Sequence, residues 1–202
     1  MVDLKLASLT VVKKADAIGK DEPMLWTMFV ELSTATLNSH QFVVTTDPLK
    51  GKLPKTGKGD SVNIPASVGR CQRNTGGIFM LGVIAVAFDN DLRTNKQIKD
   101  GYAAGAAALN QAILDHFATA GFVEPNAMQE AAMATRVSDA VRQAVIAAHG
   151  KLVAALGGKS LGSDKYFRKL LENSIDEPVT LNFNAKKDRA IYRVDGHMKF
   201  AK

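Results

Sequence analysis

A chain of 202 residues that is 46% hydrophobic and 23% charged, with a formal net charge of +6, has the composition of a globular protein with a core of useful size. Its single cysteine, Cys71, excludes an intramolecular disulfide and any multi-cysteine metal or redox motif. No long uncharged run predicts a transmembrane helix, and Asp3 and Lys5 fall where a signal peptide would be apolar. We therefore expect a cytoplasmic protein, or one exported without a recognisable signal peptide.

The first half of the chain has the periodicity of β-strands. The run 4–12 is rich in leucine, valine and threonine, which favour a strand. The run 24–32 alternates with a period of two, so it predicts a strand with one apolar and one mixed face. The apolar face holds Trp26, Met28, Val30 and Leu32, and the mixed face holds Leu25, Thr27, Phe29 and Glu31. Short strands are expected over 41–46 and 62–64, and the unbroken apolar run 78–87 is typical of a central strand covered on both faces.

The middle of the chain changes to the helical period. Apolar residues recur at spacings of three and four over 97–120 and again over 126–156, which predicts two long helices. A third, short helix is expected after Ser163, because serine is a favoured N-cap residue. These helices form a predicted insertion of about 96–173.

The period returns to two near the end of the sequence. The runs 179–183 and 190–200 predict an antiparallel hairpin. Proline biases the residue before it toward extended backbone, so Glu22-Pro23 and Glu177-Pro178 are predicted strand entries. The order strands, helices, strands predicts a single α+β domain over 1–202, in which the helical insertion packs on an antiparallel β-sheet or sandwich.

Acidic and amide side chains gather near the ends of two predicted strands. Asp16 and Asp21 precede the strand that contains Trp26, and Asp89 and Asp91 follow the central apolar strand. Oxygen ligands on flexible loops suit hard cations such as calcium. The segment 89–95 lacks the glycine and the closing glutamate of an EF-hand, so a polar turn that ends a strand and caps the next helix is the alternative interpretation.

This arrangement, with an Asp-Glu-Pro entry to an aromatic strand and a later acidic loop, resembles the protein-kinase-C-type calcium- and phospholipid-binding β-sandwich. The resemblance covers the strand-forming residues 4–91 and 179–200, and the helical middle has no counterpart in that family. Aspartates on neighbouring loops at one end of that sandwich share calcium ions. The resemblance therefore implies calcium as a cofactor, and it implies the ligands Asp16, Asp21, Asp89 and Asp91.

Four lysines lie in the glycine- and proline-rich loop DPLKGKLPKTGKGD, namely Lys50, Lys52, Lys55 and Lys58. The spacing of its glycines, and the glycine that follows the last lysine, exclude a P-loop. Clustered lysines attract polyanions, so this loop is a candidate contact for an anionic surface, and a purely solvated loop is the alternative. No aromatic residue interleaves with these lysines, and the chain has no sequence-specific nucleic-acid motif.

A catalytic motif is missing from the sequence, because the four histidines are scattered and the patterns HExxH and GxSxG are absent. Cys71 lies close to Arg70 and Arg73, which either lower the pKa of its thiol or are incidental to it.

We therefore predict a non-enzymatic module, with calcium as its candidate cofactor, that binds an unknown protein or an anionic surface through loops 13–23 and 89–95. One alternative is a hydrolase that uses the carboxylates of the same loops, which are Asp21, Glu22, Asp89 and Asp91. The other alternative is a subunit of a homo-oligomer or a larger assembly.

Overall fold

The computed structural model describes residues 1–14, 19–74, 77–89, 94–121, 123, 125–157, 162–169, 174–184 and 190–201. The strands are β1 (Val2–Lys13), β2 (Pro23–Ser33), β3 (Val43–Thr45), β4 (Ser61–Asn63), β5 (Arg70–Arg73), β6 (Ile78–Asp89), β7 (Gly162–Lys169), β8 (Ile175–Asn184) and β9 (Ile191–Phe200). The helices are α1 (Thr34–Ser39), α2 (Ala66–Gly69), α3 (Asn95–Ala120) and α4 (Ala127–Gly157), with the 3-10 turn η1 (Pro48–Gly51).

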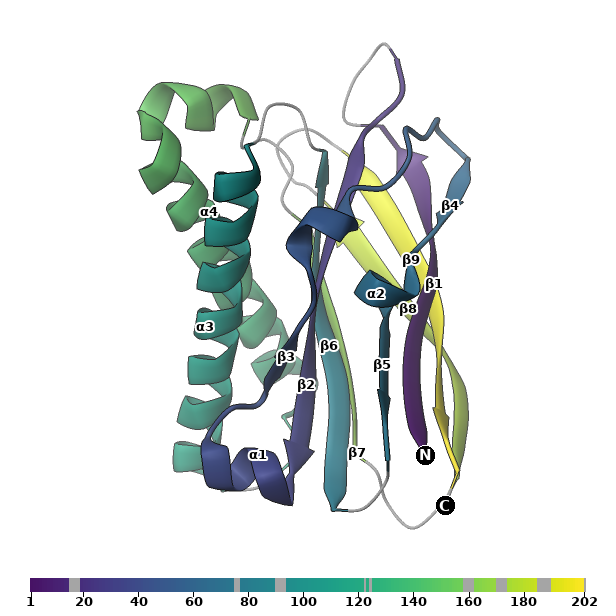
Figure 1. Ribbon diagram of the computed structural model, residues 1–202, viewed down its shortest axis with the longest axis vertical. Helices are drawn as coiled ribbons and strands as arrows, with labels where there is room; N and C mark the ends of the chain where they lie inside the picture. The colour runs from purple at the N-terminus through teal and green to yellow at the C-terminus, as the bar shows by residue number, and fades with distance from the viewer. Residues whose placement is uncertain are drawn as a thin grey trace.

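The described part of the chain forms three layers: two helices, a first sheet and a second sheet (Figure 1). The first sheet has the strand order β3-β2-β6-β7 and lies between the other two layers. The second sheet has the order β4-β1-β9-β8, and β5 also pairs with β1. Every strand pair in the described ranges is antiparallel. The α+β class predicted from the sequence is confirmed.

The first sheet is buried on both faces because its two sets of alternating side chains pack into different cores. Leu25 and Phe29 of β2 belong to the core between the two sheets. Trp26 and Met28, on the opposite face of the same strand, pack in the core under the helices. The mixed and apolar faces predicted for this strand therefore both face the interior, and β6 has the two-sided burial expected of the apolar run 78–87.

The two long helices begin at capping residues and pack closely on the first sheet. The Thr94 side chain accepts the Gln97 N–H while the Gln97 side chain accepts the Thr94 N–H, which completes a capping box for α3. Asn126 accepts the Gln129 N–H at the start of α4. A Cβ on Gly105 would lie 2.8 Å from side-chain atoms of both β2 and α4, so the missing side chain lets the three elements approach.

The prediction of a short helix after Ser163 is wrong, because this segment forms β7 beside β6. Phe167 packs in the core under the helices, whereas Tyr166 packs against the core between the sheets, which is the alternation of a strand. Gly82 of β6 leaves room for the Phe167 side chain, because a Cβ on Gly82 would lie 2.5 Å from the Phe167 ring. The helical part of the predicted insertion 96–173 therefore ends at Gly157.

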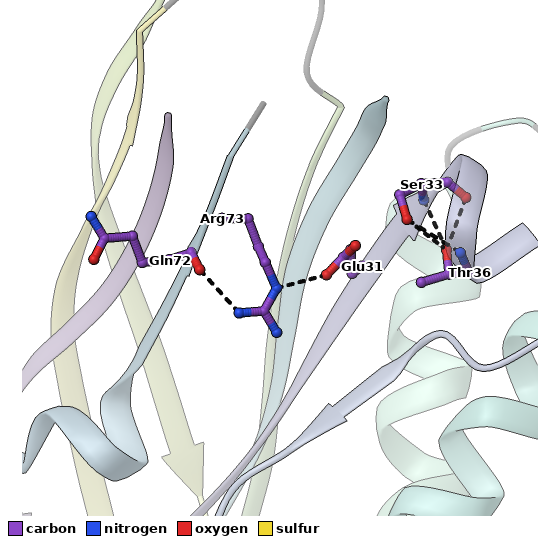
Figure 2. A network of polar contacts seen from close by, with 5 residues as sticks. All are labelled: Glu31, Ser33, Thr36, Gln72 and Arg73. Atoms are coloured by element: carbon purple, nitrogen blue, oxygen red, sulfur yellow. Dashed lines mark hydrogen bonds and ion pairs between the residues drawn. The ribbon is translucent and has the colours of Figure 1, made fainter. Parts of the chain in front are cut away.

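Polar contacts join the two sheets along both sides. On one side, the Asn182 N–H of β8 donates to Asp164 Oδ2 of β7 at 2.6 Å. On the other side, Arg73 of β5 reaches across to β2, where its Nε donates to Glu31 Oε2 at 2.9 Å (Figure 2). These contacts join the two sheets through polar groups, in addition to the apolar core that lies between them.

The first and last described residues lie together at one end of the molecule, where the Met1 amino group donates to the Ala201 carbonyl at 3.1 Å. The end of β1 and the start of β2 lie at the opposite end (Figure 1). Within the described ranges, no helix has both the length and the apolar composition that crossing a membrane requires.

Candidate functional site

The start of β2 and the end of β6 are neighbours, because Pro23 lies opposite Asp89 in the antiparallel pair. The loops 13–23 and 89–95 therefore leave from adjoining strand ends. Asp16 and Asp91 fall outside the described residues, and only the backbone of Asp89 is described. Among the described residues, no three His, Cys, Asp or Glu side chains form a group that could hold a metal ion. The calcium site stays a prediction.

Asp21, the fourth predicted calcium ligand, is buried and joins three parts of the fold. Its N–H donates to the Thr56 carbonyl at 3.1 Å, and the Thr56 N–H donates to the Asp21 carbonyl at 2.9 Å. The Tyr192 hydroxyl donates to Asp21 Oδ2 at 3.0 Å. Because Tyr192 belongs to β9, this carboxylate ties the chain before β2 to the second sheet.

Glu22, the next residue, binds two of the four lysines predicted to contact an anionic surface. Lys55 Nζ lies 2.6 Å from Glu22 Oε1, and Lys52 Nζ lies 3.4 Å from Glu22 Oε2. The hydrogen bond from Lys55 lowers the pKa of the Glu22 carboxyl, and the same contact raises the pKa of Lys55. The first Asp-Glu-Pro unit therefore starts a strand and also anchors the lysine-rich loop.

The segment 52–60 lies beside 11–14 and 19–22, which are distant from it in the sequence, at the end of the molecule opposite the N and C labels of Figure 1. The Gly59 N–H donates to the Val11 carbonyl at 2.8 Å, which joins 52–60 to the end of β1. The Asp21 and Thr56 backbones join 52–60 to 19–22. We call the lysines on these segments the lysine end; they are Lys13, Lys14, Lys20, Lys52, Lys55 and Lys58.

The lysine end is larger than the lysine loop found by sequence reasoning. Lys13 and Lys20 are exposed, and Lys14 is half-buried and donates to the Gly19 carbonyl at 2.7 Å. The remaining predicted contact, Lys50, is exposed in η1. The pair Lys13-Lys14 at the end of a predicted strand was the available signal, since the link to the next strand starts there.

Cys71 is a core residue whose thiol is hard to ionise. It is buried between the two sheets, and burial raises the pKa of the thiol to about 11 even though Arg73 acts in the opposite direction. Arg70 is bound to Asp3 on the strand surface, at 2.8 and 2.7 Å. The interpretation that the pKa of this thiol lies below its ordinary value is therefore wrong, because burial outweighs the effect of Arg73.

We expect Cys71 to resist maleimide labelling at neutral pH in the folded protein. A rise in pKa from 9.0 to about 11 lowers the thiolate fraction about 100-fold, and burial slows access further. The labelling rates of native and guanidinium-unfolded protein should therefore differ by at least that factor. Cys71→Ser is the control for reaction of maleimide with groups other than the thiol. Equal labelling rates for the native and the unfolded protein would contradict the buried position of Cys71.

Comparison of the chain with protein-family models, with curated proteins and with solved structures gave no match. The function is therefore inferred from the geometry of the lysine end and its surroundings.

Proposed function

We propose that the protein is a non-enzymatic binding module that docks on an anionic membrane surface through the lysine end. The observation that carries this proposal is the meeting of three separate segments, which gathers six lysines at one end of the molecule. Grouped lysines are attracted to anionic lipid headgroups by about 1 kcal/mol per side chain.

The chemistry of the three segments supports a lipid surface rather than a nucleic acid. The segments 11–14, 19–22 and 52–60 contain no arginine and no aromatic residue. Single-stranded nucleic acids are bound by aromatic stacking together with basic groups, and base edges are most often contacted by arginine. Lysine acts as a flexible point charge, which suits a fluid surface of phosphate groups.

The carboxylates of this end support binding over the hydrolase alternative. In glycoside hydrolases the two catalytic carboxylates lie about 5–10 Å apart and both face the substrate cleft. Asp21 is directed toward Tyr192 and Glu22 toward two lysines, so both have structural contacts in the described part of the chain. The homo-oligomer alternative and the role of calcium stay predictions.

Vesicle sedimentation tests the proposal. We expect the protein to bind vesicles that contain phosphatidylserine, to release them as salt is raised, and not to bind vesicles of phosphatidylcholine alone. Lys20→Gln together with Lys58→Gln should weaken binding roughly 30-fold, because each lysine contributes about 1 kcal/mol.

The matched control removes two lysines at the far end of the second sheet. Lys5 and Lys199 are exposed there, and Lys5→Gln together with Lys199→Gln changes the net charge by the same amount. Equal weakening by both double variants would contradict a specific surface, and so would the absence of binding to anionic vesicles. Tighter binding to a DNA duplex than to the vesicles would contradict membrane docking and would indicate a nucleic acid as the partner.

A further inference from the structure

The lysine end holds an anion that belongs to the protein itself. The Glu22 carboxylate lies between two ammonium groups, with one oxygen 2.6 Å from Lys55 Nζ and the other 3.4 Å from Lys52 Nζ. These are the contacts that a phosphate oxygen pair would make with the same two lysines. Glu22 therefore occupies the position in which these side chains would receive a lipid phosphate.

The backbone of Glu22 is fixed, whereas the two lysine side chains are free to reorient. On one side of Glu22, the backbone of Asp21 pairs with Thr56. On the other side, the Leu53 N–H donates to the Pro23 carbonyl at 2.9 Å. The side chains of Lys52 and Lys55 are 56% and 68% exposed, against 24% for Glu22. The lysines are therefore the mobile partners, and they can leave Glu22 for an external anion.

Neutral pH does not remove this internal anion. The hydrogen bond from Lys55 lowers the pKa of the Glu22 carboxyl, so the group stays ionised throughout the physiological range. A lipid phosphate that binds Lys52 and Lys55 has to replace a charged carboxylate rather than solvent. Two of the six lysines thus start from a paired state.

We infer that Glu22 is an internal competitor of the lipid phosphate, which lowers the affinity of the lysine end and makes docking depend on a high density of anionic headgroups. This inference rests on the proposed membrane docking. Exposed ion pairs contribute little to stability, so the contact has a small effect on folding and a measurable one on binding.

The test compares Glu22→Gln with the wild type on phosphatidylserine vesicles. Glutamine keeps the length of the side chain and removes its charge, so affinity should rise about threefold to tenfold while the melting temperature changes little. Asp60→Asn is the matched control, because Asp60 is an exposed acid on the same segments and its loss changes the net charge equally. We expect the control to raise affinity by less than half as much.

The outcomes separate this inference from the proposed function. One result would be vesicle binding by the wild type with an affinity that Lys20→Gln with Lys58→Gln weakens and Glu22→Gln leaves unchanged. That result would overturn the role of Glu22 as a competitor and would support the docking surface. Equal gains from Glu22→Gln and Asp60→Asn would also overturn it, because net charge alone would then explain both. If Glu22→Gln does not fold, Glu22→Asp shortens the side chain and draws the carboxylate away from the lysines, and an affinity no higher than that of the wild type counts against the inference.

Discussion

Gly196→Ala is expected to destabilise the protein by about 3 kcal/mol or more, which is the largest loss that we expect from a glycine-to-alanine substitution in this protein. A Cβ at this position would lie 2.2 Å from the Lys5 carbonyl oxygen, 2.9 Å from Leu6 Cα and 3.0 Å from the Lys5 carbonyl carbon. All three are backbone atoms of β1, so no side-chain rotation relieves the contact. The alanine therefore has to separate two paired strands of the second sheet.

The position is crowded because of an irregularity in β1. The register of β1 against β9 shifts between Leu6 and Ser8, directly beside Gly196. Such a bulge bends its strand and brings its backbone close to the partner. Glycine is the residue that leaves room for this approach.

Gly59→Ala is the matched control for Gly196→Ala. Gly59 has a φ of +86°, and a Cβ there would meet nothing within 4 Å. Its substitution should cause only the left-handed backbone penalty of about 1–2 kcal/mol. Urea unfolding of both variants measures the difference, and equal losses would show that β1 and β9 do not approach as closely as described.

Asp21→Ala is expected to lower the free energy of unfolding by about 2–3 kcal/mol, because it removes a buried carboxylate that accepts a hydrogen bond from the buried Tyr192 hydroxyl. Asp21→Asn keeps an oxygen at the same place and should cost less than half as much. Tyr192→Phe removes the other partner and should cost about 1 kcal/mol. Denaturant unfolding of the three variants orders these losses.

A calcium titration distinguishes a structural role for Asp21 from a role as a metal ligand. A bound ion stabilises the folded state, so the melting temperature should rise with calcium if a site exists. With a structural role for Asp21, Asp21→Asn should respond to calcium as the wild type does. A calcium response in the wild type that is lost in Asp21→Asn would make Asp21 a ligand, and no response in the wild type at millimolar calcium would end the calcium hypothesis.

The elements with a long, unambiguous period were predictable from the sequence. The spacing of three and four in α3 and α4 is the helical period, and the length and flanking residues of the apolar run 78–87 favour a buried strand; the structure confirms both. The segment after Ser163 was ambiguous because a short run with adjacent aromatic residues suits a helix or a strand. Pairing with β6 decided in favour of the strand, and the sequence of the segment does not contain that information.

The two Asp-Glu-Pro units show the same limit. Pro23 is the first residue of β2, as predicted, but Pro178 lies inside β8, which begins at Ile175. The N–H of Asn182 points away from β9, toward Asp164, and residues two apart along a strand point the same way. Position 178 pairs with His197 of β9, but by the same alternation its backbone nitrogen faces away from β9, so no ladder hydrogen bond is lost to the proline, which is where a strand tolerates this residue.

The candidate site depended on contacts between distant segments. The adjacency of the two acidic loops and the approach of Lys13 and Lys20 to the lysine-rich loop follow from strand pairing, not from spacing. Likewise, the sequence around Asp21 does not indicate whether this aspartate is buried or faces solvent. Its contact with Tyr192 joins residues that are 171 positions apart.

The pairing of β1 with β9 has a consequence for how the chain acquires its structure. Val2 lies opposite Phe200, so the second sheet cannot close until nearly the whole described sequence has been synthesised. The hydrogen bonds within a helix are local, whereas the apolar side chains of β1 need a partner from the far end of the described sequence. A topology so rich in distant contacts folds slowly and exposes strand edges to aggregation in the meantime. We therefore expect the yield of folded protein to depend more on chaperones and growth temperature than its final stability would suggest.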